Sequence, residues 1–141
     1  MILTTSNITG TIDLAFVDRA DIKQFIGLPG IRARYEVLAS CLHELSRLAI
    51  IQANESVLEW SSLELLRDAG PSSATRTSLR LRSICEQCQG FSGRALRKMP
   101  FLAHAMFLSH ASTSATLEQF LDALQQALQF EEASRASLTG Q

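Results

Sequence analysis

The sequence predicts a mainly α-helical protein in which about four helices follow a short α/β segment. From Ile31 onward, apolar residues recur with the period of about 3.6 residues that amphipathic helices show. Before that point, short apolar and β-branched runs alternate with loop residues, which is typical of strands. Gly27-Leu28-Pro29-Gly30 breaks the chain between the two parts, so we expect a hinge at residues 28–30.

The composition is that of a globular domain with a core of its own. The chain has 141 residues, of which 46% are hydrophobic and 19% charged, and a chain of this length buries about two-thirds of its unfolded surface. The formal net charge of −1 provides no basic field for nucleic acid or anionic lipid. No apolar run approaches the roughly 18 residues that span a bilayer. We therefore expect neither a nucleic-acid partner nor a membrane.

The segment 1–27 carries two strand patterns and one helical turn. Met1 to Thr5 and Asp21 to Ile26 are short runs rich in apolar and β-branched residues, which favour strands. Asp13 to Val17 resembles a helical turn with an acidic start.

The helical part, residues 31–136, divides into segments at its capping and breaking residues. The first helix is predicted from Ile31 to about Ile50, with Ile31, Tyr35, Leu38, Leu42 and Leu45 on its apolar face. A short helix follows, capped by Ser61 or Ser62 and running through Leu66. The small polar run from Pro71 to Ser78 predicts a loop. The next helix, with Leu81, Ile84, Cys85 and Cys88 on one face, ends at Gly90.

Two further helices complete the pattern. Ser92 is a predicted N-cap for a helix to about Leu108, which Pro100 should kink or locally open. After a linker from His110 to Ser114, Thr116 caps a last helix, and the polar tail after Arg135 is expected to fray.

Three polar groups could take part in phosphate chemistry. Asn7 follows the first strand, where an amide can hold a water molecule by donating and accepting hydrogen bonds. Arg19 ends the short helical turn and could present its guanidinium to a phosphate. Ser92, Gly93 and Arg94 form a capped helix start with free N–H groups and a cation, which suits an anion. Each also has an ordinary structural interpretation. Asn7 could be a turn residue, Arg19 could form a surface ion pair with Asp18 or Asp21, and Ser92 could be a solvated N-cap.

The other candidates favour structural roles. The sequence has three cysteines, Cys41, Cys85 and Cys88, an odd number that is typical of a reducing compartment. Cys85 and Cys88 share an apolar helix face and lack the second ligand pair of a zinc site, so we interpret them as core residues and expect no metal site. Arg76, Arg80 and Arg82 are interpreted as a solvated helix face.

The order of these groups resembles that of the AAA+ ATPase family. Asn7 matches the sensor 1 strand end, Arg19 the helix with the trans-acting arginine finger, and Arg94 sensor 2 in the third lid helix. The blocks at residues 3–9, 16–27 and 91–105 are similar to the pachytene checkpoint protein 2 subfamily, the thyroid-hormone-receptor-interacting remodellers of HORMA-domain proteins. This resemblance extends over about residues 1–131.

The resemblance implies a C-terminal part of such an ATPase. Residues 1–27 would be the end of the α/β nucleotide-binding core and residues 31–136 the helical lid. Asn7 would orient the attacking water, Arg19 would reach the neighbouring subunit's γ-phosphate, and Arg94, with Ser92 and Gly93, would contact the nucleotide of its own subunit.

The same resemblance implies the partners and the cellular setting. The complete subunit would bind ATP and magnesium, form a homohexamer, act with an adaptor on HORMA-domain proteins in meiotic recombination and spindle-checkpoint control, and reside in nucleus and cytoplasm.

The sequence departs from the family in lacking a G-x-x-x-x-G-K-[ST] loop and an acidic pair after a hydrophobic strand. We therefore expect this chain alone to hold no nucleotide tightly and to be inactive. We also expect residues 1–27 to leave exposed strand edges, while residues 31–131 fold independently. Two alternatives stay open: a non-catalytic helical interaction module, and a redox or metal role for Cys85 and Cys88.

Overall fold

The computed structural model describes residues 5, 15, 18, 19, 21–52, 56–65, 72–108 and 114–139. Its helices are α2 (Ile31–Arg47), α3 (Trp60–Leu65), α4 (Ser73–Gln87), α5 (Gly93–Ala103), the π-helical segment η1 (His104–Leu108) and α6 (Leu117–Thr139). The predicted mainly α class is confirmed. In this described part, no helix is both long and apolar enough to cross a bilayer.

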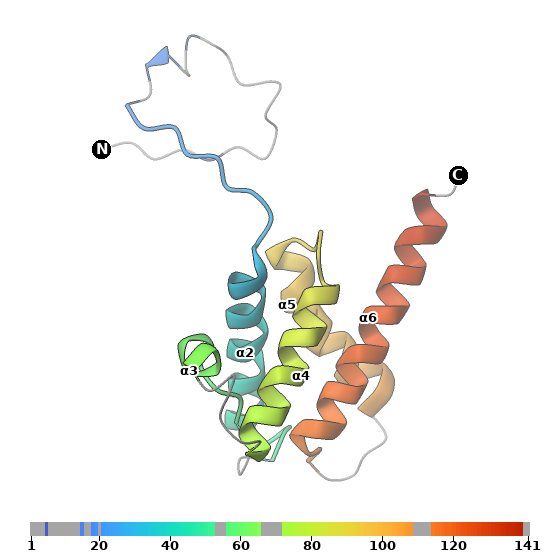
Figure 1. Cartoon of the computed structure of the whole chain (residues 1–141). Coiled ribbons are helices and arrows are strands. Elements are labelled where there is room, and N and C mark those ends of the chain that lie inside the picture. Colours follow the sequence, from blue (N-terminus) through green and yellow to red (C-terminus); the bar gives the residue numbers. More distant parts are fainter. Residues whose placement is uncertain are drawn as a thin grey trace.

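Four of the helices form a bundle, and the short α3 packs on its side (Figure 1). α5 contacts α2 and α6, α4 also contacts α2 and α6, and α3 contacts α2 and α4. α2 and α5 run in one direction, whereas α4 and α6 run in the other. As a consequence, α2 and α5 both begin at the end of the bundle where α4 finishes.

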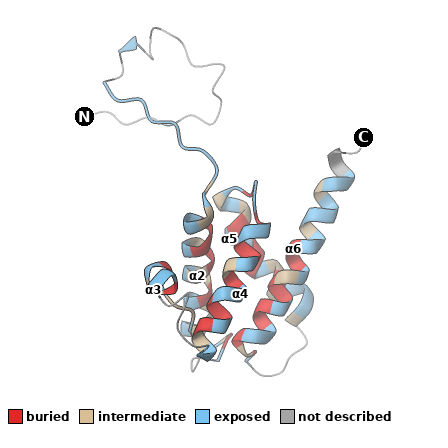
Figure 2. Ribbon diagram, in the orientation of Figure 1, coloured by how far each residue is buried: buried red, intermediate tan, exposed pale blue. Residues whose placement is uncertain are grey.

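The core lies between the facing sides of these helices, as Figure 2 shows. Tyr35, Leu38 and Leu42 are buried on α2, which confirms the centre of the predicted apolar face, while Ile31 and Leu45 are only partly buried. Cys85 and Cys88 are also buried and unbridged, in agreement with their interpretation as core residues. Burying each large apolar side chain stabilises the fold by about 1.5–3 kcal/mol.

Helix α2 ends slightly earlier than predicted because Ala49 adopts a left-handed conformation. Its φ is 57°, and the amide of Ile50 donates to the carbonyl of Leu45 at 3.0 Å. This hydrogen bond closes the helix end in the manner of a Schellman motif. The chain then continues to Ile51, which forms a parallel bridge with Ala115 just before α6.

The predicted loop from Pro71 to Ser78 is wrong over Ser73 to Ser78, which form the first turns of α4. Ser72 is the N-cap, and its hydroxyl accepts a hydrogen bond from the amide of Thr75 at 3.1 Å. The Ser78 hydroxyl donates to the Ala74 carbonyl at 2.6 Å. Small hydroxylated residues can thus satisfy helix backbone groups as well as turns, and here tertiary packing decides in favour of the helix.

Helix α3 begins before its predicted cap. It starts at Trp60, so Ser61 and Ser62 lie within the helix. Trp60 is buried, and its ring meets that of Tyr35 edge-on at a centroid distance of 5.4 Å. This packing fixes the start of the helix without either serine.

The tail of the chain also differs from the prediction, since α6 continues through Arg135 to Thr139. Arg135 lies over the ring of Phe91 with 3.8 Å between its guanidinium carbon and the ring centroid. This cation–π contact holds the end of α6 against the bundle, which favours a continuous helix there over a frayed end.

The strand predicted from Asp21 to Ile26 is not formed. Residues 21–26 have no regular secondary structure and are exposed, with Ile22, Phe25 and Ile26 at 87%, 77% and 85% exposure. A strand is stable only when its backbone pairs with another strand, and no such partner is present among the described residues.

The last two helices follow their predicted signals. Pro100 lies within α5, which stays α-helical through Ala103, and the wider π-helical segment η1 begins four residues after the proline rather than at it. The Thr116 hydroxyl accepts from the Gln119 amide at 3.2 Å, and the Gln119 side chain accepts from the Thr116 amide at 2.9 Å. This reciprocal pair is a capping box.

Candidate functional site

The predicted N-cap at Ser92 is formed, and it sets the direction of α5. Ser92 has extended backbone angles, and its hydroxyl accepts a hydrogen bond from the Ala95 amide at 3.2 Å. Leu96 and Met99, one and two turns along the helix, are almost fully buried in the core. The cap and these two anchors hold the start of α5 rigidly at the end of the bundle.

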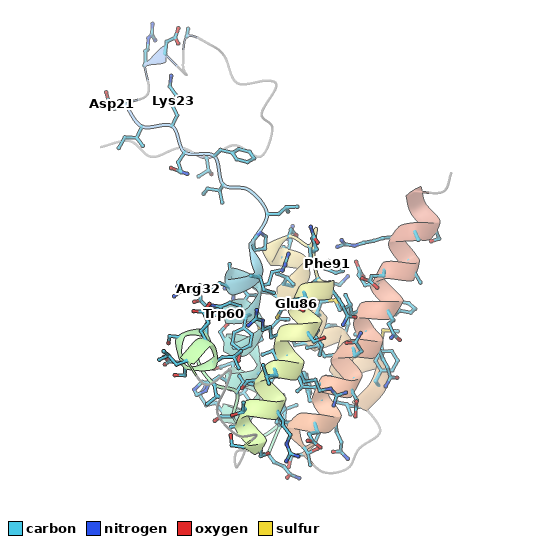
Figure 3. All side chains as sticks on the ribbon, in the orientation of Figure 1. Asp21, Lys23, Arg32, Trp60, Glu86 and Phe91 are labelled. Carbon is cyan, nitrogen blue, oxygen red and sulfur yellow. The ribbon has the colours of Figure 1, made fainter. Side chains whose placement is uncertain are left out.

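The turn before α5 is fixed by Gly90 and Phe91. Gly90 has a φ of 84°, a conformation that a side chain would strain. Phe91 is 2% exposed and packs beneath the guanidinium of Arg135. Figure 3 shows Phe91 at the end of the bundle where α2 begins. The turn that precedes Ser92 is therefore anchored on both α4 and α6.

Gly93 and Arg94 occupy the first two positions of α5, where backbone N–H groups have no partner within the helix. The Arg94 side chain is exposed, and none of the ion pairs among the described residues includes it. A Cβ placed on Gly93 would meet no atom within 4 Å, so the space beside the helix start is open. Two free amides, a positive helix end and an unpaired guanidinium together suit a phosphate oxygen.

A second helix starts at the same end of the bundle. Gly30 is the N-cap of α2 and provides no side-chain cap, so the first amides of α2 also have no acceptor among the described residues. α2 and α5 pack side by side in the same direction (Figure 1). Two positive helix ends thus face the segment 21–30, which leaves the bundle here.

Sequence reasoning missed one charged residue at this end, Arg34. Its side chain is only 9% exposed, and its Nη1 donates a long hydrogen bond of 3.5 Å to the Pro29 carbonyl. A signal was present in the sequence, because Arg34 lies three residues after Ile31 and four before Leu38, on the apolar face of α2. An arginine in that position indicates a buried cation.

The predicted sites in the first 20 residues are placed only in part. Arg19 is exposed, whereas Asn7 lies outside the described residues. The structure therefore brings together Ser92, Gly93 and Arg94 and does not place Asn7 against them.

The basic residues of α4 are partly engaged in contacts. Arg80 pairs with Asp122 of α6, which links two helices of the bundle. Arg82 pairs with Glu86 and lies 5.2 Å from the centroid of the Trp60 ring. Arg76 is exposed. The predicted solvated face thus holds structural contacts at two of its three positions.

Two surface hollows lie away from the start of α5. One, of about 470 Å³, lies between α2 and residues 56–59 and includes His43, Arg47 and Glu59. The other, of about 270 Å³, lies between η1 and α6 and includes Phe107, Gln119 and Asp122. Within the described ranges, no group of three histidine, cysteine, aspartate or glutamate residues could hold a metal ion. Neither hollow includes Ser92, Gly93 or Arg94.

The environment of Cys85 and Cys88 keeps both thiols protonated. Burial raises the pKa of Cys85 to about 12 and that of Cys88 to about 11. In both cases the positive charge of Arg34 acts in the opposite direction and is outweighed. Neutral buried thiols are poor nucleophiles and poor metal ligands, which supports their role in the core.

Comparisons with known proteins agree with this geometry. Residues 30–132 match the family described as TRIP13-like, AAA+ ATPase lid C-terminal domain. The chain is 46% identical over 139 residues to the pachytene checkpoint protein 2 homolog of Mus musculus, covering 97% of the chain and 32% of that protein. Identity to the Oryza sativa homolog is 46% over 140 residues, covering 93% of the chain and 29% of that protein.

A solved structure gives the same result for the fold. The structure of C. elegans PCH-2 matches with a TM-score of 0.72 and 28% identity, covering 91% of this chain and 32% of that one. The chain thus spans about a third of the length of the relatives that it matches.

Proposed function

Because the chain belongs to the TRIP13-like family of AAA+ ATPase lid domains, we propose that it is the lid end of a ring-forming ATPase subunit. In that subunit, the lid closes over ATP bound to the core, and Arg94 contacts the γ-phosphate. The capped start of α5, with its free amides and exposed Arg94, carries this proposal.

The residues at the start of α5 fit a phosphate group by charge and by hydrogen-bond direction. Gly93 and Arg94 supply two backbone donors that point out of the helix, and the guanidinium supplies a fork of further donors. These amide and guanidinium groups are all hydrogen-bond donors, and phosphate oxygens are acceptors. ATP with magnesium, bound by the complete subunit, supplies the anhydride bond that is hydrolysed. The P-loop and magnesium ligands would come from parts of the subunit beyond these 141 residues.

Two more residues complete the proposed catalytic set. Arg19, which is exposed, would reach the γ-phosphate in the neighbouring subunit of a homohexamer. Asn7 would orient the attacking water. Residues 1–27 would belong to the core and residues 28–30 to the hinge, so the extended segment 21–26 would become a strand when the rest of the core pairs with it. The isolated chain would neither hold nucleotide tightly nor turn it over.

The biological role is proposed from the relatives, whose printed names refer to the pachytene checkpoint. The complete ring would use ATP hydrolysis to remodel HORMA-domain proteins, with an adaptor, in meiotic recombination and spindle-checkpoint control. Nucleus and cytoplasm are the proposed locations, and neither nucleic acid nor a membrane is a proposed partner.

The test is ATP turnover by the complete ring with single substitutions in this part. Arg94→Ala and Arg19→Ala should each lower kcat by at least about a hundredfold, as loss of a transition-state contact does. Arg97→Ala is the matched control, because Arg97 is exposed on the same helix as Arg94 and should leave turnover unchanged. Near-normal turnover in both test variants would refute the proposal and favour a non-catalytic helical interaction module.

A further inference from the structure

Arg34 is a buried cation whose charge the described part of the protein does not neutralise. The side chain is 9% exposed, and its buried Nε has no hydrogen-bond acceptor among the described residues. The one hydrogen bond that it makes, from Nη1 to the Pro29 carbonyl, is long at 3.5 Å. None of the ion pairs among the described residues involves it. Buried guanidinium groups normally have a paired anion and several hydrogen bonds.

The position of the guanidinium can be derived from its neighbours. The bond to Pro29 shows that the side chain reaches back beyond the start of α2. Its charge also acts on the thiols of Cys85, in the last turn of α4, and of Cys88, the C-cap residue of that helix. Arg34 therefore lies at the end of the bundle where α2 begins and α4 finishes.

The thiols next to Arg34 do not neutralise its charge. Burial raises the pKa of Cys85 to about 12 and that of Cys88 to about 11, so both are uncharged at neutral pH. The C-terminal end of α4 provides a partial negative charge, which is smaller than a full unit charge. The carboxylate of Glu132 on α6 also acts on Cys88, but Glu132 is exposed and forms no ion pair with Arg34. The buried guanidinium of Arg34 therefore still lacks a paired anion among the described residues.

The surroundings of Arg34 also favour an anion. The first amides of α2 have no acceptor in the part of the chain that the structure describes, because Gly30 provides no side-chain cap. α5, which packs beside α2 and begins at the same end, contributes the free amides of Gly93 and Arg94 (Figure 1). Two positive helix ends and the guanidinium groups of Arg34 and Arg94 thus lie at one end of the bundle. Among the described carboxylates, Glu132 included, none forms an ion pair with either group.

We propose that Arg34 and the first amides of α2 bind a second phosphate group of the nucleotide, beside the phosphate that Arg94 contacts. This inference rests on the proposed function, because it extends the same nucleotide site. It assigns a binding role to α2 as well as to α5. The ligand class is a polyphosphate, since it carries neighbouring anionic groups that two helix starts can hold at once.

Titration of the 141-residue chain with inorganic tripolyphosphate at constant ionic strength tests this site. Amide chemical shifts in NMR spectra report where the anion binds. We expect saturable shifts at residues 31–33 and 93–95. Arg34→Met keeps the apolar stem and removes the charge, and it should weaken binding about tenfold, the value of one charge-assisted hydrogen bond. Arg97→Ala is the control and should bind like the unchanged chain.

The outcomes separate this inference from the proposed function. If Arg34→Met binds tripolyphosphate normally while Arg94→Ala does not, the role of Arg34 is refuted and that of Arg94 stands. If the unchanged chain shows no saturable shifts at residues 31–33, the inference also fails, whereas ATP turnover by the Arg94→Ala ring still tests the proposed function. Glutarate binding as tightly as tripolyphosphate would identify a carboxylate as the ligand and refute the phosphate assignment.

Thermal unfolding provides a second readout that does not depend on binding. Because the charge of Arg34 is not neutralised, Arg34→Met should fold with an unchanged or higher Tm, whereas removing one partner of a satisfied ion pair lowers it. A clearly lower Tm for Arg34→Met would show that the fold already neutralises this cation, and it would refute the inference.

Discussion

Two side chains hold the peptide group around Leu58 against the bundle, and their removal gives a sharp test of the packing. The Tyr35 hydroxyl donates to the Leu58 carbonyl at 2.7 Å, and the Leu58 amide donates to the Ser78 hydroxyl at 2.8 Å. Tyr35 and Ser78 are 1% and 0% exposed. Residues 56–59 thus connect α2 to α4 through two hydrogen bonds at one residue. Tyr35→Phe and Ser78→Ala each remove one of them with little change in shape.

The expected cost follows from burial. Each substitution leaves one backbone group of Leu58 without its partner, and an unsatisfied buried polar group costs about 1–3 kcal/mol. Leu58 itself is only partly buried, so water can replace some of the lost bonding. We therefore expect about 1–2 kcal/mol of unfolding free energy for each variant. The double variant should cost less than the sum, because losing either bond already loosens the segment.

Urea unfolding of the 141-residue chain, followed by far-UV circular dichroism, measures these free energies. Ser83→Ala is the matched control, since Ser83 is exposed on the same helix as Ser78, and it should change stability by less than about 0.5 kcal/mol. Costs below that limit for both test variants, or strict additivity in the double variant, would refute the reasoning.

Three further predictions concern the helix end, the core and the thiols. Ala49→Gly should stabilise the chain by about 1 kcal/mol in urea unfolding, because Ala49 has a φ of 57°; a loss of stability would contradict this. Phe120→Ala should cost about 3–5 kcal/mol, since Phe120 is fully buried; a cost below 1 kcal/mol would contradict the packing. Burial raises the pKa of Cys85 to about 12 and of Cys88 to about 11 from an ordinary 9.0. Their contribution to stability is therefore complete below pH 9 and lost as pH rises through the folded values, because the unfolded thiols ionise first. Iodoacetamide at neutral pH should modify Cys41, which is partly exposed, before either of them, and equal rates for all three would contradict their burial.

The helical domain was predictable where amphipathic periodicity and caps coincide. α5 and α6 combine both signals, whereas α2 has the periodicity without a side-chain cap, and the structure places the apolar faces of all three in one core. The start of α4 was not predictable in the same way, because Ser73 to Ser78 are residue types that serve turns and helix ends alike. The strand predicted at 21–26 is not formed, because a strand requires a pairing partner, and the local sequence pattern does not report whether one is present.

The candidate site was predictable where local backbone geometry defines it. Ser92, Gly93 and Arg94 form a capped helix start, and one short sequence determines that arrangement. Arg34 was missed because an arginine is expected at the surface, and only the packing of α2 against α4 and α5 buries it.

The central claim is that the start of α5 contacts the nucleotide's γ-phosphate. An experimental structure of the complete subunit with a non-hydrolysable ATP analogue measures this directly, as the distance from the Arg94 guanidinium nitrogens to the γ-phosphate oxygens. The account predicts a charge-assisted hydrogen bond of about 2.7–2.9 Å. A separation beyond roughly 6 Å in a closed, nucleotide-bound subunit, where a direct ionic contact is lost, would contradict it.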